Sequence, residues 1–159
     1  MSETQIIIGN QNATRCFYLP TAPKLAQCWL PDNVDAIPAL ITANGNHWRK
    51  ILTIMAKLSV KDNNWKHYRD TQLLKQDECI VIQATELTPN AQQHFICGQQ
   101  SAQSLTFDTS DFTTLCGSED YVSVNNKLSI YLCPYLDYRQ FPNKHIDNLR
   151  LKMGLLPID

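Results

Sequence analysis

Short apolar runs and longer stretches with helical periodicity alternate along the chain. Four of the runs have the length and the β-branched content of buried strands. They are Gln5–Gly9, Glu78–Ala84, His94–Gly98 and Leu128–Cys133. Buried strands separated by helices form parallel sheets that are covered on both faces. We therefore expect a single α/β domain over residues 1–159, with α/β/α layers around a mostly parallel sheet of four or five strands.

The clearest helix follows Asn44-Gly45-Asn46. An apolar residue recurs there every three or four positions from Trp48 to Ala56, which places one apolar stripe along a helix. Asn46 is the expected N-cap, because its side chain can accept a hydrogen bond from the first turn. We expect this helix to end near Ser59. Further helices are predicted within Val34–Ala43 and Lys61–Leu74, after Gly98, and from Asn143 to Gly154.

The remaining segments are predicted to be loops and turns. Asn10–Pro31 is interrupted by three prolines and is expected to form a surface loop. Thr113–Val124 is expected to form two short strands around a turn. In sheets of this class, ligands bind beyond the carboxyl ends of the strands. The loops predicted at those ends are Gly9–Asn12, Ala84–Thr88, Gly98–Gln100 and Pro134–Asn143.

Composition narrows the class of protein without identifying it. With 43% hydrophobic and 18% charged residues, the chain has the make-up of a globular domain and not of a disordered one. The net charge of −1 indicates neither a nucleic acid nor a membrane surface as the partner. No stretch approaches the ~20 apolar residues of a membrane-spanning helix.

The first residues and the cysteines together favour the cytoplasm. Residues 1–5 are polar, and Ile6-Ile7-Ile8 is too short for the apolar part of a signal peptide. The six cysteines are therefore expected to be free thiols. None belongs to a Cys-x-x-Cys pair, and His94 and Cys97 should point to opposite faces of one strand. We expect no metal site, and no motif indicates a cofactor.

Two polar segments are candidate binding loops. Pro134–Asn143 carries three aromatic residues together with Asp137 and Arg139, a combination that suits base stacking and phosphate capture. The alternative is a loop whose aromatic residues cover the sheet. The second segment is Gly9-Asn10-Gln11-Asn12, which offers three side-chain amides to a ligand and a glycine that lets the ligand approach the backbone closely. The alternative is an ordinary turn at the end of the strand. This segment lacks the glycine spacing of a dinucleotide loop and the lysine of a P-loop.

Basic and histidine side chains on the clearest helix are weaker candidates. Arg49, Lys50 and Lys57 form a stripe that either contacts phosphates or is simply solvated. His47 is a residue type that serves as a general acid or base, or it is a surface residue. No Ser-His-Asp or Cys-His pattern of an activated nucleophile is visible.

Four fragments, in their order along the chain, carry a family resemblance. They are Gly9-Asn10-Gln11, Asn46-His47-Trp48-Arg49-Lys50-Ile51, Gly98-Gln99-Gln100-Ser101-Ala102 and Cys133-Pro134-Tyr135. This order resembles the uracil-DNA-glycosylase superfamily, especially its mismatch-specific branch, over most of residues 5–154. The resemblance implies one α/β domain with a four-stranded, mostly parallel sheet. It also implies a pocket at the strand ends that receives a base flipped out of DNA.

Two positions depart from the pattern of that superfamily. The superfamily has Asp or Asn two residues after the glycine of the first strand, and this side chain places the attacking water. This chain has Gln11 at that position, and a glutamine cannot act as a base. The last loop of the superfamily carries His or Asn beside the proline, whereas this chain has Tyr135, a phenol that can donate a hydrogen bond to an anion. The sequence also resembles small bacterial proteins that keep a fold while changing its site.

The resemblance and its departures together predict a non-catalytic or divergent domain that recognises a nucleobase or nucleotide, in a nucleic acid or as a small molecule. Gln11, Asn12, Trp48 and Tyr135 would line the base pocket, and Arg139 with Lys50 would hold phosphate; this list follows from the resemblance. One alternative is an active glycosylase that hydrolyses the N-glycosidic bond of a flipped base. A protein-binding domain and an unrelated α/β hydrolase are the others.

Overall fold

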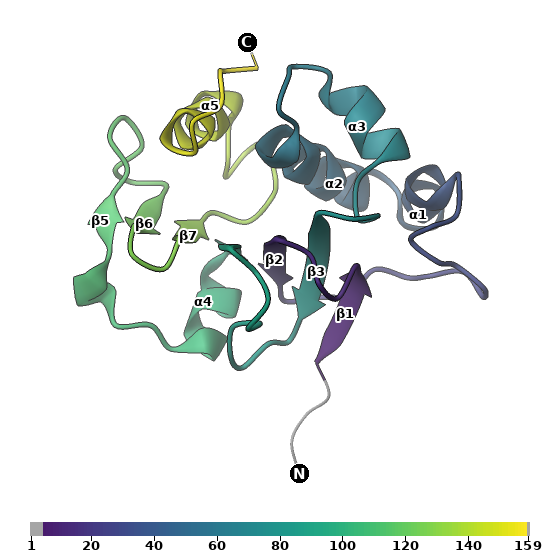
Figure 1. The fold of residues 1–159 in the computed structure, drawn as a ribbon, viewed down its shortest axis with the longest axis horizontal. Helices are drawn as coiled ribbons and strands as arrows, with labels where there is room; N and C mark the ends of the chain where they lie inside the picture. Colours follow the sequence, from purple (N-terminus) through teal and green to yellow (C-terminus); the bar gives the residue numbers. More distant parts are fainter. Residues whose placement is uncertain (1–4, 159) are drawn as a thin grey trace.

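A seven-stranded sheet forms the centre of the computed structural model, which describes residues 5–158 (Figure 1). In chain order the strands are β1 (Ile6–Gly9), β2 (Arg15–Leu19), β3 (Glu78–Ile82), β4 (Gln93–Cys97), β5 (Thr113–Thr114), β6 (Ser123–Asn125) and β7 (Ile130–Cys133). Across the sheet their order is β1-β3-β2-β4-β7-β6-β5. Most of the polar start of the chain, residues 1–4, lies outside the described residues.

The sheet is mixed, so the prediction of a mostly parallel sheet of four or five strands, like that of the uracil-DNA glycosylases, is wrong. The four neighbours β3, β2, β4 and β7 are parallel. At one edge β1 runs antiparallel to β3, and at the other edge β6 and β5 continue the sheet in antiparallel pairs. The apolar pattern misled because a run buried on both faces has the same pattern in either strand direction.

One strand lies inside the segment that was predicted to be a loop. β2 ends immediately before Pro20 and occupies the centre of the parallel strands, between β3 and β4. Four of its five residues, Cys16–Leu19, are buried. The first parallel strand is therefore β2 and not Gln5–Gly9, and this moves the loop Gly9–Asn12 to the opposite end of the sheet.

Helices cover both faces of the sheet. They are α1 (Ala36–Asn44), α2 (Asn46–Ser59), α3 (Trp65–Thr71), α4 (Gln99–Leu105) and α5 (Asn143–Lys152), with a short 3-10 helix at Thr109–Asp111. α1, α2, α3 and α5 gather on one face, and α4 lies on the other (Figure 1).

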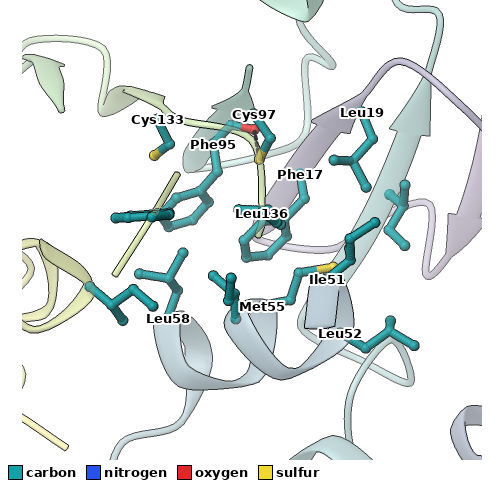
Figure 2. Packing of buried hydrophobic residues seen from close by; sticks show 14 of the residues in the cluster. Phe17, Leu19, Ile51, Leu52, Met55, Leu58, Phe95, Cys97, Cys133 and Leu136 are labelled. Atoms are coloured by element: carbon teal, nitrogen blue, oxygen red, sulfur yellow. Dashed lines mark hydrogen bonds between the residues drawn. The ribbon is translucent and has the colours of Figure 1, made fainter. Parts of the chain in front are cut away.

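Each face has its own apolar core. On the face of α2, the rings of Phe17 and Phe95 stack with their centres 4.6 Å apart, and Ile51 and Met55 of α2 belong to the same core (Figure 2). On the face of α4, residues such as Tyr18 and Ile96 pack with Leu105. His94 lies on this second face while Cys97 faces α2, so the predicted opposite orientation of these two side chains is confirmed.

The periodicity correctly predicts α2, but its polar details differ from the expectation. The N-cap is Gly45, and the Asn46 side chain accepts a hydrogen bond from Arg49 Nε (3.2 Å) instead of capping the helix. Lys57 is not part of a solvated stripe: only 6% of it is exposed. Its Nζ donates to Asn143 Oδ1 (2.9 Å) and lies 4.9 Å from the centre of the Trp65 ring. Asn143 begins α5 as predicted, although its side chain does not cap that helix.

The connections of the parallel strands create one reversal point. From β2 the chain pairs β3 on one side and then crosses to β4 on the other side. Open α/β sheets bind ligands beyond the strand carboxyl ends at such a reversal. Here those ends are Leu19 of β2 and Cys97 of β4, with Cys133 of β7 next to them. Within the described residues, no helix combines the length and the apolar character needed to cross a membrane.

Candidate functional site

An open cleft of about 820 Å³ lies at this reversal point, beyond the carboxyl ends of β2, β4 and β7. Its lining comes from five parts of the chain that are distant in sequence. These parts are Pro20-Thr21 after β2, His47 of α2, residues 96–100 and Ala102 of β4 and α4, residues 119–121 with Ser123 before and in β6, and residues 132–135 with Gln140 in and after β7. The topology of the sheet thus assembles the site, as expected for the strand ends.

An aromatic pair, Tyr135 and His47, forms one wall of the cleft. The two rings stack with centres 5.7 Å apart and planes 27° apart. Tyr135 Oη and His47 Nε2 are hydrogen-bonded at 2.9 Å. Burial raises the pKa of the Tyr135 phenol, so the hydroxyl keeps its proton at neutral pH. The pair joins the loop after β7 to the first turn of α2.

Gly98 fixes the backbone against this aromatic wall. Its N–H donates to the carbonyl of Cys133 (2.9 Å), which ties the end of β4 to the end of β7. The residue has φ +91, and a Cβ placed on it would lie 3.4 Å from Tyr135 Cδ1. The positive φ therefore favours glycine at this position, and a Cβ there would be in van der Waals contact with the Tyr135 ring.

The segment between β5 and β6 forms another part of the lining and is held by a buried polar cluster. Ser118 Oγ is hydrogen-bonded to His145 Nδ1 (2.6 Å) and accepts from Asn148 Nδ2 (2.8 Å). Burial lowers the pKa of His145, which favours the neutral ring. Tyr121 stacks on His145 with ring centres 3.7 Å apart. This cluster anchors the neighbouring Glu119, which lines the cleft, to α5.

The charge of the cleft is acidic. Glu119 and Asp120 belong to the lining, whereas none of the described residues that line the cleft is Lys or Arg. The Gly117 N–H donates to Glu119 Oε2 (2.8 Å), and this hydrogen bond lowers the pKa of Glu119. Glu119 is therefore ionised at neutral pH. An acidic cleft disfavours phosphate groups and accepts neutral or cationic ligands.

Of the residues predicted to bind the ligand, only Tyr135 lines the cleft, beside His47, which the sequence offers as a general acid or base or as a surface residue. Trp48, although adjacent to His47, is 4% exposed and belongs to the apolar core. Asp137 lies 3.8 Å from Lys50 and accepts a hydrogen bond from the N–H of Arg139. Lys50 and Arg139 are not among the residues that line the cleft. The aromatic loop after β7 thus contributes its first tyrosine to the cleft, while its charged residues lie outside.

The segment Gly9-Asn10-Gln11-Asn12 lies at the other end of the sheet. Gly9 pairs with Cys79 near the start of β3, because β1 is antiparallel. Asn10 Nδ2 donates to the carbonyl of Gln76 (2.7 Å), and Asn12 Oδ1 accepts from Asn90 (3.2 Å). The structure does not bring Gln11 or its neighbours together with Tyr135.

Several lining residues had no signal of their own in the sequence. Thr21 and Pro20 lie in the predicted loop that contains β2, and Glu119 and Tyr121 lie in the segment predicted to form two short strands around a turn. A correct assignment of β2 would identify Pro20 as a candidate lining residue, because it directly follows the carboxyl end of that strand, where ligands bind. Within residues 5–158, no group of three or more His, Cys, Asp or Glu side chains is arranged to hold a metal ion.

Of the comparisons with known proteins, only the one with protein families gave a match. Searches of curated proteins and of solved structures found no match. One family model matches residues 6–154, and this range includes every strand of the sheet and the whole lining of the cleft. The chain belongs to this family, described as a family of unknown function (DUF6942).

Proposed function

We propose that the protein is a non-catalytic domain that binds a nucleobase as part of a small molecule, in the cleft beside Tyr135. The observation that carries this proposal is the stacked pair of Tyr135 and His47 at the reversal point of the sheet. A flat aromatic wall favours a planar ligand, since every nucleobase has a π-face that stacks on such a ring.

The polar lining supports a nucleobase over a purely apolar ring. Gln99, Gln100 and Gln140 each line the cleft, and an amide offers both a donor and acceptors. Glu119 adds an ionised acceptor. The edges of nucleobases present donors and acceptors in mixed order, which amides and carboxylates match.

The acidic lining argues for a small molecule over DNA or a nucleotide. A phosphate would be repelled by Glu119 and Asp120, and the basic residues proposed to hold it, Lys50 and Arg139, lie outside the cleft. All six cysteines are free, which supports a cytoplasmic location as part of the same proposal.

Binding without catalysis is favoured over base excision by the position of Gln11. The resemblance gave this residue the place of the water-activating acid, yet it lies at the end of the sheet opposite the cleft. The phenol of Tyr135 keeps its proton at neutral pH. In the tautomer in which His47 Nε2 donates their shared hydrogen bond, the Tyr135 hydroxyl can donate to a carbonyl on a base edge.

Calorimetric titration with uracil and with adenine tests the proposal. Base stacking on an aromatic side chain contributes about 1–3 kcal/mol, so Tyr135→Ala should weaken binding roughly fivefold to 150-fold. Tyr135→Phe keeps the ring and should retain most of the affinity. Arg139→Ala, which changes an exposed residue outside the cleft, is the matched control.

Three results would contradict the proposal. Wild-type protein that binds neither base would remove the nucleobase as the ligand. A folded Tyr135→Ala variant with unchanged affinity would remove the assigned wall. Release of uracil from a uracil-containing oligonucleotide, detected as alkali-sensitive strand breaks, would make the protein a glycosylase and not a binding domain.

A further inference from the structure

A smaller pocket of about 140 Å³ adjoins the cleft at the carboxyl ends of β2 and β3. Pro20 and Gln100 line both cavities, so the two are neighbours along one edge of the sheet. Taking ~30 Å³ for each water molecule in the liquid, the pocket has room for roughly four or five waters, which is also the scale of one small ring. The cleft therefore has a side compartment.

A buried hydroxyl without a partner lines this pocket. Ser101 is 7% exposed, and its Oγ has no hydrogen-bond partner among the described residues. Buried polar groups are nearly always paired, because leaving one unpaired costs stability. Ser104, one turn further along α4, differs: its Oγ donates to the carbonyl of Gln100 (3.1 Å). Ser101 is thus free to bond a ligand, whereas Ser104 is already paired.

The rest of the lining combines uncharged polar residues with the apolar Leu19, Pro20, Ala84 and Leu105. Gln83 and Thr85 follow β3, and they meet Gln100 and the two serines of α4 around the pocket. None of the described residues that line the pocket carries a charge. Hydroxyls and amides, each able both to donate and to accept, match the alternating donors and acceptors of a sugar.

We infer that this pocket is a sugar subsite and that the ligand of the protein is a nucleoside, with its base against Tyr135 and a sugar hydroxyl bonded to Ser101. The inference rests on the proposed function, since it extends the same cleft. It also agrees with the charges. The lining of both cavities, as far as the structure describes it, lacks Lys and Arg, so a neutral sugar fits where a phosphate does not.

The test compares each base with its own nucleoside by calorimetric titration, using uracil with uridine and adenine with adenosine. The wild-type protein should bind one nucleoside more tightly than its base. One hydrogen bond to a neutral group changes affinity by about twofold to tenfold, so Ser101→Ala should remove a gain of that size. Ser101→Ala should leave the affinity for the free base unchanged. Gln103→Ala, which changes an exposed residue of α4 that lines neither cavity, is the matched control and should keep the preference for the nucleoside.

The outcomes separate this inference from the proposed function. If a base and its nucleoside bind equally, the sugar subsite is wrong while the proposed function stands. If neither binds, both are wrong. If Ser101→Ala keeps the full preference for the nucleoside, the assignment of Ser101 is wrong. A melting temperature of Ser101→Ala that equals the wild-type value would show that lost affinity comes from the contact and not from unfolding, and a large fall would identify Ser101 as structural.

Discussion

The two ends of the parallel strands use their polar residues in opposite ways. At the amino end, Glu78 is fully buried and accepts hydrogen bonds from Arg15 Nη2 (2.8 Å), from the Tyr68 hydroxyl and from the N–H of Leu74 (3.2 Å). At the carboxyl end, Ser101 is unpaired, and the amides and carboxylates face an open cleft. Although Arg15 Nε at the amino end also has no partner among the described residues, the contacts of Glu78 there hold the fold together, while Ser101 and the lining of the cleft remain available for a ligand.

The largest expected effect is a loss of folding stability when the contacts of Glu78 at the amino end of the strands are removed. Glu78→Ala leaves the Arg15 guanidinium and the Tyr68 hydroxyl without their acceptor, and removing one partner of a buried ion pair costs about 3–5 kcal/mol. Urea unfolding measures this loss. Asp77→Ala is the control, because Asp77 is half-exposed and lies 3.9 Å from the same guanidinium. Equal losses in the two variants would contradict the division between the two ends.

A second comparison uses two glycines with similar backbone conformations. Gly98→Ala and Gly45→Ala both place a side chain at positive φ, which costs about 1–3 kcal/mol of folding stability. A Cβ at Gly98 would also lie against Tyr135, whereas nothing lies within 4 Å of one at Gly45. Thermal unfolding should therefore show similar losses, while calorimetric titration with uracil and adenine should show weaker binding for Gly98→Ala alone. Unchanged affinity in that variant would mean that Gly98 does not position the aromatic wall.

The pH dependence of stability tests a buried histidine near the start of β4. His94 Nδ1 is hydrogen-bonded to the Tyr18 hydroxyl (2.7 Å), and burial lowers the pKa of His94 below its ordinary value near 6.5. The folded protein therefore binds fewer protons at His94 than the unfolded chain does. Its contribution to stability is complete above pH ~6.5 and is lost as the pH falls below that value. Urea unfolding from pH 7.5 down to pH 5 should show a smaller loss for His94→Gln than for the wild type, and parallel losses would refute this origin.

The smallest expected effect is at Arg139. This residue is exposed and lies outside the lining of the cleft. Arg139→Ala should change the free energy of unfolding by less than about 0.5 kcal/mol and should leave the affinity for uracil and adenine unchanged. A clear loss of binding would place Arg139 in the binding site, contrary to its position outside the cleft.

The sequence was most informative where one pattern dominates. The stripe from Trp48 to Ala56 correctly predicts α2, and the apolar runs at β3, β4 and β7 correctly predict strands. The direction of β1 is not predictable from the sequence, because an apolar run of isoleucines is compatible with either strand direction. β2 was missed because its five residues stand next to Pro20 in a segment rich in loop signals.

The candidate site was harder to predict than the fold, and strand assignment explains why. The sequence predicts Tyr135 as a site residue because it follows a recognisable strand, and Tyr135 lines the cleft. The same reasoning predicts a binding loop at Gly9-Asn10-Gln11-Asn12. The antiparallel direction of β1 places this segment at the other end of the sheet. Lys57 seemed a surface cation because helical periodicity places it opposite the stripe. The aromatic rings of Trp65 and Tyr138 cover it from elsewhere in the chain.

The antiparallel pairing of β1 with β3 also has a consequence for how the chain folds during synthesis. β1 leaves the ribosome before β3, pairs with β3 and has no other neighbour among the described strands. The apolar residues of β1 have no strand to pair with until the ribosome has synthesised the chain through Ile82. Contacts that close so long a loop form late and slowly. Until then the nascent chain carries β1 as an unpaired apolar segment, and such segments are binding sites for chaperones and starting points for aggregation.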